Sequence, residues 1–315
     1  MAATVLNAML PVVLTLMLGV VAAWHQDFDE DAASVLNRMV MMYALPLALF
    51  AGIVATPRSQ LEGDYTLIGI VVVGLLAGYF LPLVLAHWVF RRDIMTSTLQ
   101  AIAIGGPSVA FVGYPVLGYL FGQSAATIPI VVSALVLVLI QVPISMVLLA
   151  SAAAKRGDKS GAPSTISGCI ISALKQPMVW GPVIGFIIML LGLPIPMALR
   201  QSMALLGHAT AGVALFASGV ILYSRRITFN LPVAITTLAR NVLVPLAVWG
   251  MALAFGLNPK TLDVAVLTLA IPSAVICVIL AVQFRAAEQE MASTLFFSTM
   301  LSLPTMGVFI WLLGA

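Results

Sequence analysis

Long runs of apolar residues, separated by short polar stretches, make up most of this chain. A helix needs about 20 apolar residues to cross the hydrocarbon core of a bilayer, and ten runs approach that length. We therefore predict an all-α integral membrane protein with ten transmembrane helices. The expected spans are residues 4–23, 35–55, 66–90, 97–120, 125–150, 177–194, 202–224, 230–256, 262–284 and 291–313.

The fourth and ninth runs each contain an interruption. Residues 104–115 hold three glycines, two prolines and a serine inside apolar sequence, and Pro107-Ser108 recurs as Pro272-Ser273, 165 residues later. Proline lacks a backbone N–H and clashes with the preceding turn, so we expect both helices to break there. Broken helices at membrane depth are tolerated only where protein or a water-filled cavity satisfies the freed backbone groups. Paired interruptions in two halves of a chain therefore indicate a transporter binding site.

Other short sequence segments recur at nearly the same spacing of 165 residues, which indicates an internal duplication. The tetrapeptide Ala-Leu-Phe-Ala at 48–51 returns at 214–217, and the fifth and tenth runs each carry a late proline, Pro143 and Pro304. With five spans in each half, the second half is upside down relative to the first, which predicts an inverted repeat. The expected units are a first five-helix repeat at 1–150, a cytoplasmic linker at 151–176 and a second five-helix repeat at 177–315.

Composition and charge agree with a membrane protein. Hydrophobic residues make up 62% of the chain and charged residues 8%, against about 25% charged residues in soluble domains. If both termini lie outside, ten Lys and Arg residues fall on the cytoplasmic side and three outside. Because cytoplasmic loops are rich in Lys and Arg, we expect both the N-terminus and the C-terminus outside.

Four polar residues lie on or beside the two interruptions: Ser108, Tyr114, Ser273 and Gln283. Half-helix N-termini there would present positive dipole ends and free N–H groups that suit an anion. Freed carbonyl groups could equally hold a cation. In the alternative interpretation the prolines only kink two helices and the serines bond back to their own backbone.

A few further polar residues lie inside spans. Arg240, followed by Asn241, is the basic residue well inside a span, where a charge by default faces a cavity or a partner. It could neutralise an anionic substrate, or it could snorkel to the cytoplasmic surface. Gln141 could line the site from the fifth span. His208 and Thr210 could serve a proton step, because histidine titrates near neutral pH, or could make structural hydrogen bonds.

Several function classes are excluded by what the sequence lacks. All eleven acidic residues fall in or near loops, which argues against a carboxylate relay of the kind found in proton pumps. The sequence contains no P-loop, no Gly-x-Ser-x-Gly motif and no His/Glu metal spacing. We therefore expect no enzyme, no resident metal and no cofactor, with Na⁺ or H⁺ as the coupling ion.

Four segments carry a family resemblance over nearly the whole chain: Phe111-Val112-Gly113-Tyr114-Pro115, Val179-Trp180-Gly181-Pro182, Leu243-Val244-Pro245, and Pro272 with the downstream Ala281-x-x-Phe284. With this order and spacing the chain resembles the auxin efflux carrier family of secondary transporters, especially its bacterial malonate-transporter-like members. The resemblance implies ten spans in two inverted five-helix repeats that cross at the breaks of spans four and nine. It also implies a scaffold part and a mobile transport part, as in bile acid sodium symporters.

The resemblance also implies organic anions as substrates, held at the crossing. Ser108 stands where the family has an asparagine, and Ser273 is its counterpart in the second half. This departure favours a small carboxylate over an indole. A multi-pass protein of the bacterial inner membrane follows, with the lipid bilayer and the anion as partners and no nucleic acid. The family also makes a homodimer reasonable.

The sequence thus predicts a secondary active transporter that moves a small organic anion, such as the dicarboxylate malonate, by alternating access. The alternatives are a sodium-coupled bile acid or organic anion symporter, an auxin-like weak-acid efflux carrier, a channel and a non-transporting membrane receptor. The residues expected to contact substrate are Ser108, Val109, Tyr114, Ser273, Gln141, Arg240 and Asn241; those expected to form the crossing are Gly106, Pro107 and Pro272; and those considered for ion coupling are His208, Thr210 and Gln283.

Overall fold

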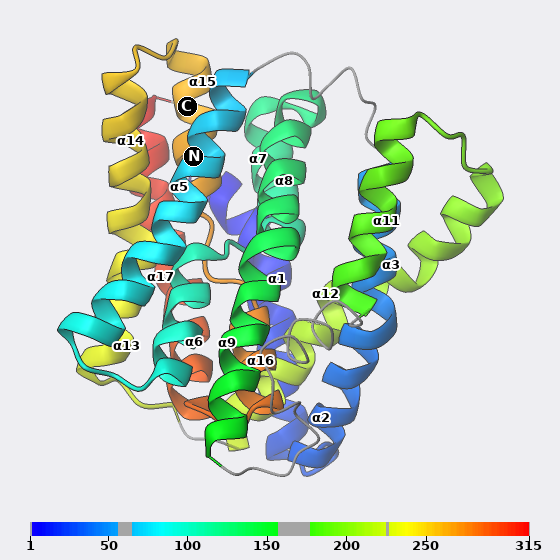
Figure 1. Cartoon of the computed structure of the whole chain (residues 1–315), viewed down its shortest axis with the longest axis vertical. Helices are drawn as coiled ribbons and strands as arrows, with labels where there is room; N and C mark the ends of the chain where they lie inside the picture. Colours follow the sequence, from blue (N-terminus) through cyan, green and yellow to red (C-terminus); the bar gives the residue numbers. More distant parts are fainter. Residues whose placement is uncertain (1, 56–64, 157–176, 225–226, 315) are drawn as a thin grey trace.

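The computed structural model of the chain describes residues 2–55, 65–156, 177–224 and 227–314, which form helices joined by short connections (Figure 1). Segments with π-helical hydrogen bonding are labelled η. In chain order the elements are α1 Ala2–Trp24, α2 Glu30–Met39, η1 Val40–Ala44, α3 Leu45–Ala55, α5 Tyr65–Val84, η2 Leu85–Val89, α6 Ile94–Gly105, η3 Val109–Gly113, α7 Tyr114–Phe121, α8 Gln123–Val136, η4 Leu137–Gln141, α9 Val142–Lys155, α11 Pro177–Leu191, α12 Met197–Ser224, α13 Leu231–Leu238, η5 Ala239–Leu243, α14 Val244–Ala254, α15 Pro259–Ala270, α16 Ile276–Gln283 and α17 Glu288–Leu313.

Helical residues lie in all ten ranges that the hydrophobic pattern predicts, but fewer helices have the length and composition of a full membrane span. Within the described residues, five helices are long and apolar enough to cross a membrane. A sixth span is added if the two halves of α17, which meet at an angle of 41° beside Pro304, are taken as one helix. The five are Glu30–Ala55, Tyr65–Val89, Ile128–Lys155, Met197–Ser224 and Leu231–Ala254. The difference has a physical cause, because the fourth and ninth runs are each divided in two and α11 has only 15 residues.

The predicted breaks are confirmed. The fourth run divides after Gly105, where α6 ends, and the ninth divides after Ala270, where α15 ends. The connector expected from residue 151 begins later, since α9 continues to Lys155, and residues 157–176 lie outside the described part.

Several other prolines do not break their helices. Four of the five π-helical segments in the described residues are followed, two residues later, by a proline: Pro46, Pro115, Pro143 and Pro245. A proline in an α-helix removes one hydrogen bond and clashes with the carbonyl four residues back. A π turn adds one residue to the helical turn and moves that carbonyl away. The helices therefore continue through these prolines with a local widening.

The helices pack in two groups. In Figure 1, α3, α11 and α12 lie together on the right, and α5, α6, α13, α14, α15 and α17 lie on the left. The first halves of the two interrupted runs, α6 and α15, belong to the left group, and the segment between α15 and α16 passes beside the segment between α6 and η3. The helices thus hold two non-helical stretches together in the interior.

Candidate functional site

Two interrupted helices cross at one point and pair there as a minimal β-bridge. Pro107 and Ser273 form this antiparallel bridge. The amide of Ser108 donates to the carbonyl oxygen of Pro272 at 2.9 Å, and the amide of Ala274 donates to that of Gly106, also at 2.9 Å. Each break therefore supplies a donor and an acceptor to the other, which satisfies groups that an isolated break would leave unpaired.

Side chains from other helices complete the hydrogen bonds at the end of α6. The carbonyl of Ala103 would normally accept from residue 107, but proline has no N–H; the Ser273 hydroxyl donates to it instead, at 2.7 Å. The carbonyl of Gly105 accepts from Gln141 Nε2 at 3.2 Å. Free carbonyls at a helix end need such partners when they are buried. Ser273 and Gln141 thus hold the first break in place.

Arg240, in η5, is fully buried and reaches both breaks. Its Nη1 donates to the carbonyl of Ile104 at 2.8 Å, and its Nε donates to the carbonyl of Ile271 at 2.8 Å. Its Nη2 donates to Ile271 as well. One guanidinium therefore joins the carbonyl ends of α6 and α15, and all of these bonds go to the backbone.

Asn241 and Ser298 form a second buried connection beneath the crossing. Asn241 Nδ2 donates to the Ser298 carbonyl at 2.8 Å, and the Ser298 hydroxyl donates to Asn241 Oδ1 at 2.7 Å. The same Ser298 hydroxyl accepts from the amide of Ser273 at 3.0 Å. Through this chain α17 fixes the backbone of the second break.

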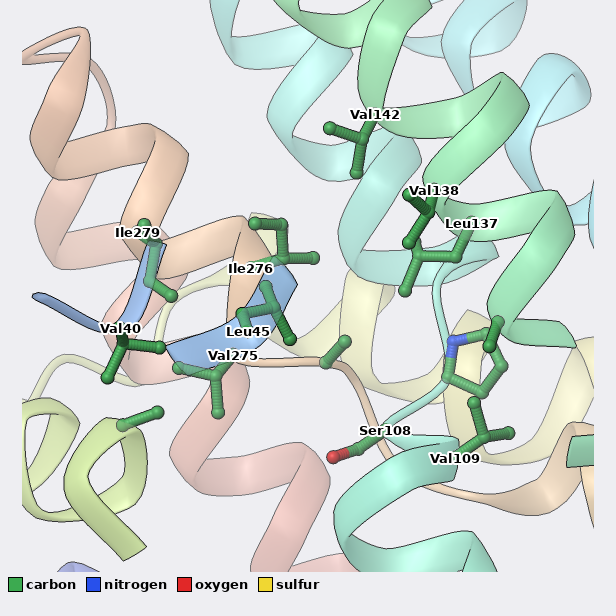
Figure 2. Close-up of a pocket in the computed structure, with 14 residues that line it drawn as sticks. Val40, Leu45, Ser108, Val109, Leu137, Val138, Val142, Val275, Ile276 and Ile279 are labelled. Atoms are coloured by element: carbon green, nitrogen blue, oxygen red, sulfur yellow. The ribbon is translucent and has the colours of Figure 1, made fainter. Parts of the chain in front are cut away.

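A cavity of about 60 Å³ lies beside the crossing, between the two groups of helices. Pro107, Ser108 and Val109 line it from the first break, Ala274 and Val275 from the second, and the other walls come from η1, α3, α8, η4, α9, α12 and α16. Figure 2 shows the Ser108 hydroxyl among apolar side chains. Among the described residues of this lining, Ser108 is the one polar residue, and it is 5% exposed.

The Ser108 hydroxyl borders the cavity, whereas the Ser273 hydroxyl donates to the carbonyl of Ala103. The described lining therefore offers one hydroxyl beside the N-terminal end of the helix that starts at Val109. The first amides of a helix have no intrahelical acceptors and carry partial positive charge. Such a cavity suits a small molecule with one anionic group and an apolar remainder.

The predicted site residues separate into two sets. Ser108, Val109 and Pro107 line the cavity, whereas Ser273, Gln141, Arg240 and Asn241 hold the crossing from outside its lining. Gly106 and Pro272 take part in the crossing through their carbonyls.

Of the remaining candidates, the structure describes the side chains of Gln283 and Thr210. Gln283 is exposed at the end of α16 farther from the break, and Thr210 is buried in α12 with no hydroxyl partner among the described residues. Tyr114 starts α7 and His208 lies in α12, but their side chains are outside the described part of the structure. Thr210 is not among the described residues that line the cavity.

Two buried contacts were not predicted from the sequence. The Tyr79 hydroxyl lies 2.7 Å from the Ser145 hydroxyl, and Ser298 joins Asn241 to Ser273. The second had a detectable signal, since Thr294, Ser298 and Ser302 recur every four residues inside an apolar span and therefore share one helix face. All three are buried.

The fold and the site together define a multi-pass membrane protein with two broken helices that cross beside a buried cavity. The chain belongs to the family described as "Membrane transport protein", whose model matches residues 4–310. It is 31% identical over 278 residues to the "Uncharacterized transporter YfdV" of Escherichia coli (strain K12), covering 88% of this chain and 87% of that relative. The protein is thus a member of a transporter family and not an enzyme.

Two further relatives cover almost the full length. An "Uncharacterized transporter" of Methanothermobacter thermautotrophicus is 24% identical over 300 residues, covering 94% of each chain. A "Putative malonate transporter" of Rhizobium meliloti is 24% identical over 316 residues, covering 99% of this chain and 96% of the relative.

Proposed function

We propose that this protein is a secondary active transporter that moves a small organic anion by alternating access, with substrate held at the crossing of the two broken helices. The observation that carries the proposal is the position of Ser108, which lines the cavity at the crossing, while the side chains of Ser273, Arg240 and Asn241 bond the backbone there. A serine hydroxyl can donate a hydrogen bond to an anionic ligand. A carboxylate is a suitable acceptor.

Corresponding geometry in the two halves supports an inverted repeat of five helices. The two broken half-helices α6 and α15 have 12 residues each, and their bounds are 165 positions apart. Asp93 and Asn258 cap them, again 165 apart, with φ/ψ of −62°/152° and −64°/151°. The hydrogen bond between Tyr79 and Ser145 joins the third and fifth runs, as Asn241 and Ser298 join the eighth and tenth. Such agreement is expected of a duplicated unit.

The position of the cavity supports alternating access. Its walls come from the group that contains the crossing and from α12 and the α2–α3 helix of the other group, through Ala214, Val40 and Leu45. Movement of one group against the other would open the cavity to alternate sides of the membrane. We place the protein in the bacterial inner membrane with both termini outside, on the distribution of Lys and Arg, and propose a homodimer.

Malonate is the first substrate to test, because one relative carries that activity in its name. The experiment is uptake of radiolabelled malonate by proteoliposomes, with sodium and proton gradients imposed separately. Saturable uptake that unlabelled malonate inhibits is the expected result. Absence of uptake under both gradients, from protein shown to be folded, would contradict malonate as the substrate.

A carboxylate with an apolar body is the second candidate, and the cavity lining favours it. Apart from Ser108, the described residues that line the cavity are apolar, and none of them carries a cationic side chain for a second carboxylate. Burying an unpaired charge in such surroundings is costly. Competition of the malonate signal, or direct uptake, with butyrate and phenylacetate separates the two classes. If malonate, butyrate and phenylacetate are all neither taken up nor inhibitory, the result would contradict transport of a small carboxylate.

A further inference from the structure

Arg240 occupies a position where a broken-helix protein can hold a cation. The carbonyl ends of α6 and α15 converge at the crossing, and freed carbonyls at such ends can coordinate Na⁺ or a similar ion. Here the guanidinium lies between them, with Nη1 on Ile104 and with Nε and Nη2 on Ile271. The place between the two carbonyl ends is already filled by a side chain.

The charges at this position are balanced. The carbonyl end of a helix is equivalent to about half a negative charge, so the two ends together offset the single positive charge of the guanidinium. Arginine stays protonated in proteins, and no carboxylate in the described residues pairs with Arg240. The helix ends therefore act as its counter-charge, and a second cation at the same place would meet repulsion from the guanidinium.

Hydrogen-bond geometry also favours a guanidinium here over a metal ion. The planar guanidinium carries donors that point in different directions, which allows one side chain to bond carbonyls from two helices. Arg240 itself belongs to η5, a π turn followed by Pro245. It therefore ties both half-helices to the helix of residues 231–254.

We propose that Arg240 is a built-in cation that takes the place of a coupling sodium ion between the two breaks, so that transport by this protein does not depend on Na⁺. The proposal rests on the proposed transport function. It assigns a positioning role to Arg240, which acts through the carbonyls of Ile104 and Ile271 and does not line the cavity.

The first test uses the wild-type protein. Its melting temperature in detergent is measured in NaCl, KCl and choline chloride at equal ionic strength, and uptake into proteoliposomes is compared in the same three salts at fixed pH. We expect the same melting temperature and the same initial uptake rate in all three. Stabilisation or uptake that requires Na⁺ would overturn the proposal.

The second test removes the side chain. Arg240→Ala leaves a cation-sized space between two carbonyl groups, so its melting temperature is expected to fall and to recover in part with low millimolar guanidinium chloride or with NaCl, but not with choline chloride. Arg38→Ala is the matched control, because Arg38 is exposed in α2. Wild type and Arg38→Ala are expected to show no such recovery. An Arg240→Ala variant that melts like wild type, or that small cations do not stabilise, would contradict the proposal.

A second substitution and a measurement without substrate make the test of Arg240 independent of folding failure and of the substrate assignment. If Arg240→Ala cannot be purified folded, Arg240→Lys keeps the positive charge but not the planar donors, and it is expected to stay independent of Na⁺. A sodium-dependent Arg240→Lys would count against the proposal. Because melting temperature is read without any substrate, a wrong substrate assignment leaves this result unaffected and appears only in the uptake experiment.

Discussion

Ser108 and Ser273 lie on the two paired segments of the crossing and use their hydroxyl groups differently. The amide of Ser108 bonds the carbonyl of Pro272, next to Ser273, yet its hydroxyl faces the cavity. The Ser273 hydroxyl donates to Ala103 at 2.7 Å, which is the carbonyl that Pro107 leaves without an amide donor. Of two residues that match in the sequence, one therefore lines the cavity and the other bonds the backbone of the opposite break.

This difference predicts opposite effects of two alanine substitutions. Ser108→Ala removes a hydroxyl that borders the cavity, so it should weaken substrate binding and change the melting temperature little. Ser273→Ala leaves the buried Ala103 carbonyl unsatisfied and should lower the free energy of unfolding by about 1–3 kcal/mol. Thermal or denaturant unfolding measures the second effect, and KM for uptake measures the first.

The outcome that counts against this assignment is the reverse pattern. A strongly destabilised Ser108→Ala would mean that its hydroxyl has a structural partner. Ser273→Thr is a useful comparison, because it keeps the donor to Ala103. It should be more stable than Ser273→Ala if the backbone at the crossing accepts the extra methyl group.

Pro107→Ala and Pro272→Ala are predicted to reduce uptake while the protein still reaches the membrane. An alanine at 107 restores an amide that can bond Ala103 and so competes with Ser273 for the same carbonyl. We expect the α6 helix to extend into the break and the bridge between Pro107 and Ser273 to weaken. Uptake is compared at equal amounts of protein in the membrane, and normal uptake in both variants would reject the crossing as the working site.

Close packing of α1 on α12 predicts a sharp contrast between two glycines of α12. A Cβ on Gly219 would overlap the carbonyl oxygen of Leu16 and lie 3.0 Å from Gly19 Cα, whereas a Cβ on Gly212 would meet nothing within 4 Å. Gly219→Ala should therefore cost at least about 1–3 kcal/mol through overpacking. Gly212→Ala should stabilise the helix by up to about 0.5–1 kcal/mol. Melting temperatures of the two variants check the prediction, and similar values would contradict the packing.

An ion pair connects the segment just before the N-terminus of α6 to α17. Arg92 donates to both carboxylate oxygens of Glu290 at 2.9 and 2.7 Å, and Gln100 donates to one of them at 2.8 Å. The pair is only partly exposed, with side chains 28% and 12% accessible. Glu290→Gln should lower the free energy of unfolding by about 1–3 kcal/mol, between the values for exposed and buried pairs.

A double-mutant cycle tests whether this effect belongs to the pair. Arg92→Ala and Glu290→Gln should destabilise the protein less in combination than the sum of the two single changes. The ion pair of Arg156 with Asp93, whose side chains are 54% and 43% accessible, is the matched exposed pair, and its cycle should give less than about 1 kcal/mol. Additive effects for Arg92 and Glu290 would show that the contact does not stabilise the protein.

The sequence by itself determined the helical class, the positions of the helices, the two breaks and the family. Each depends on local information: apolar runs form helices in a bilayer, and prolines at 107 and 272 remove amides that no neighbour in the chain replaces. Recurrence at a constant offset also predicted that α6 and α15 correspond, and their equal lengths agree with it.

The tertiary structure alone decided which groups satisfy the crossing. Arg240 could have faced substrate, snorkelled or bonded the backbone, and only the packing of η5 against two helix ends selects the carbonyls of Ile104 and Ile271. Ser108 and Ser273 each follow a proline in an interrupted apolar run, and their contacts differ because Ala103 and Ser298 lie beside Ser273 and a cavity lies beside Ser108. These partners are far apart in the chain. Hydropathy and proline positions predict where a helix stops, but the choice of partner depends on which distant segments the fold brings together.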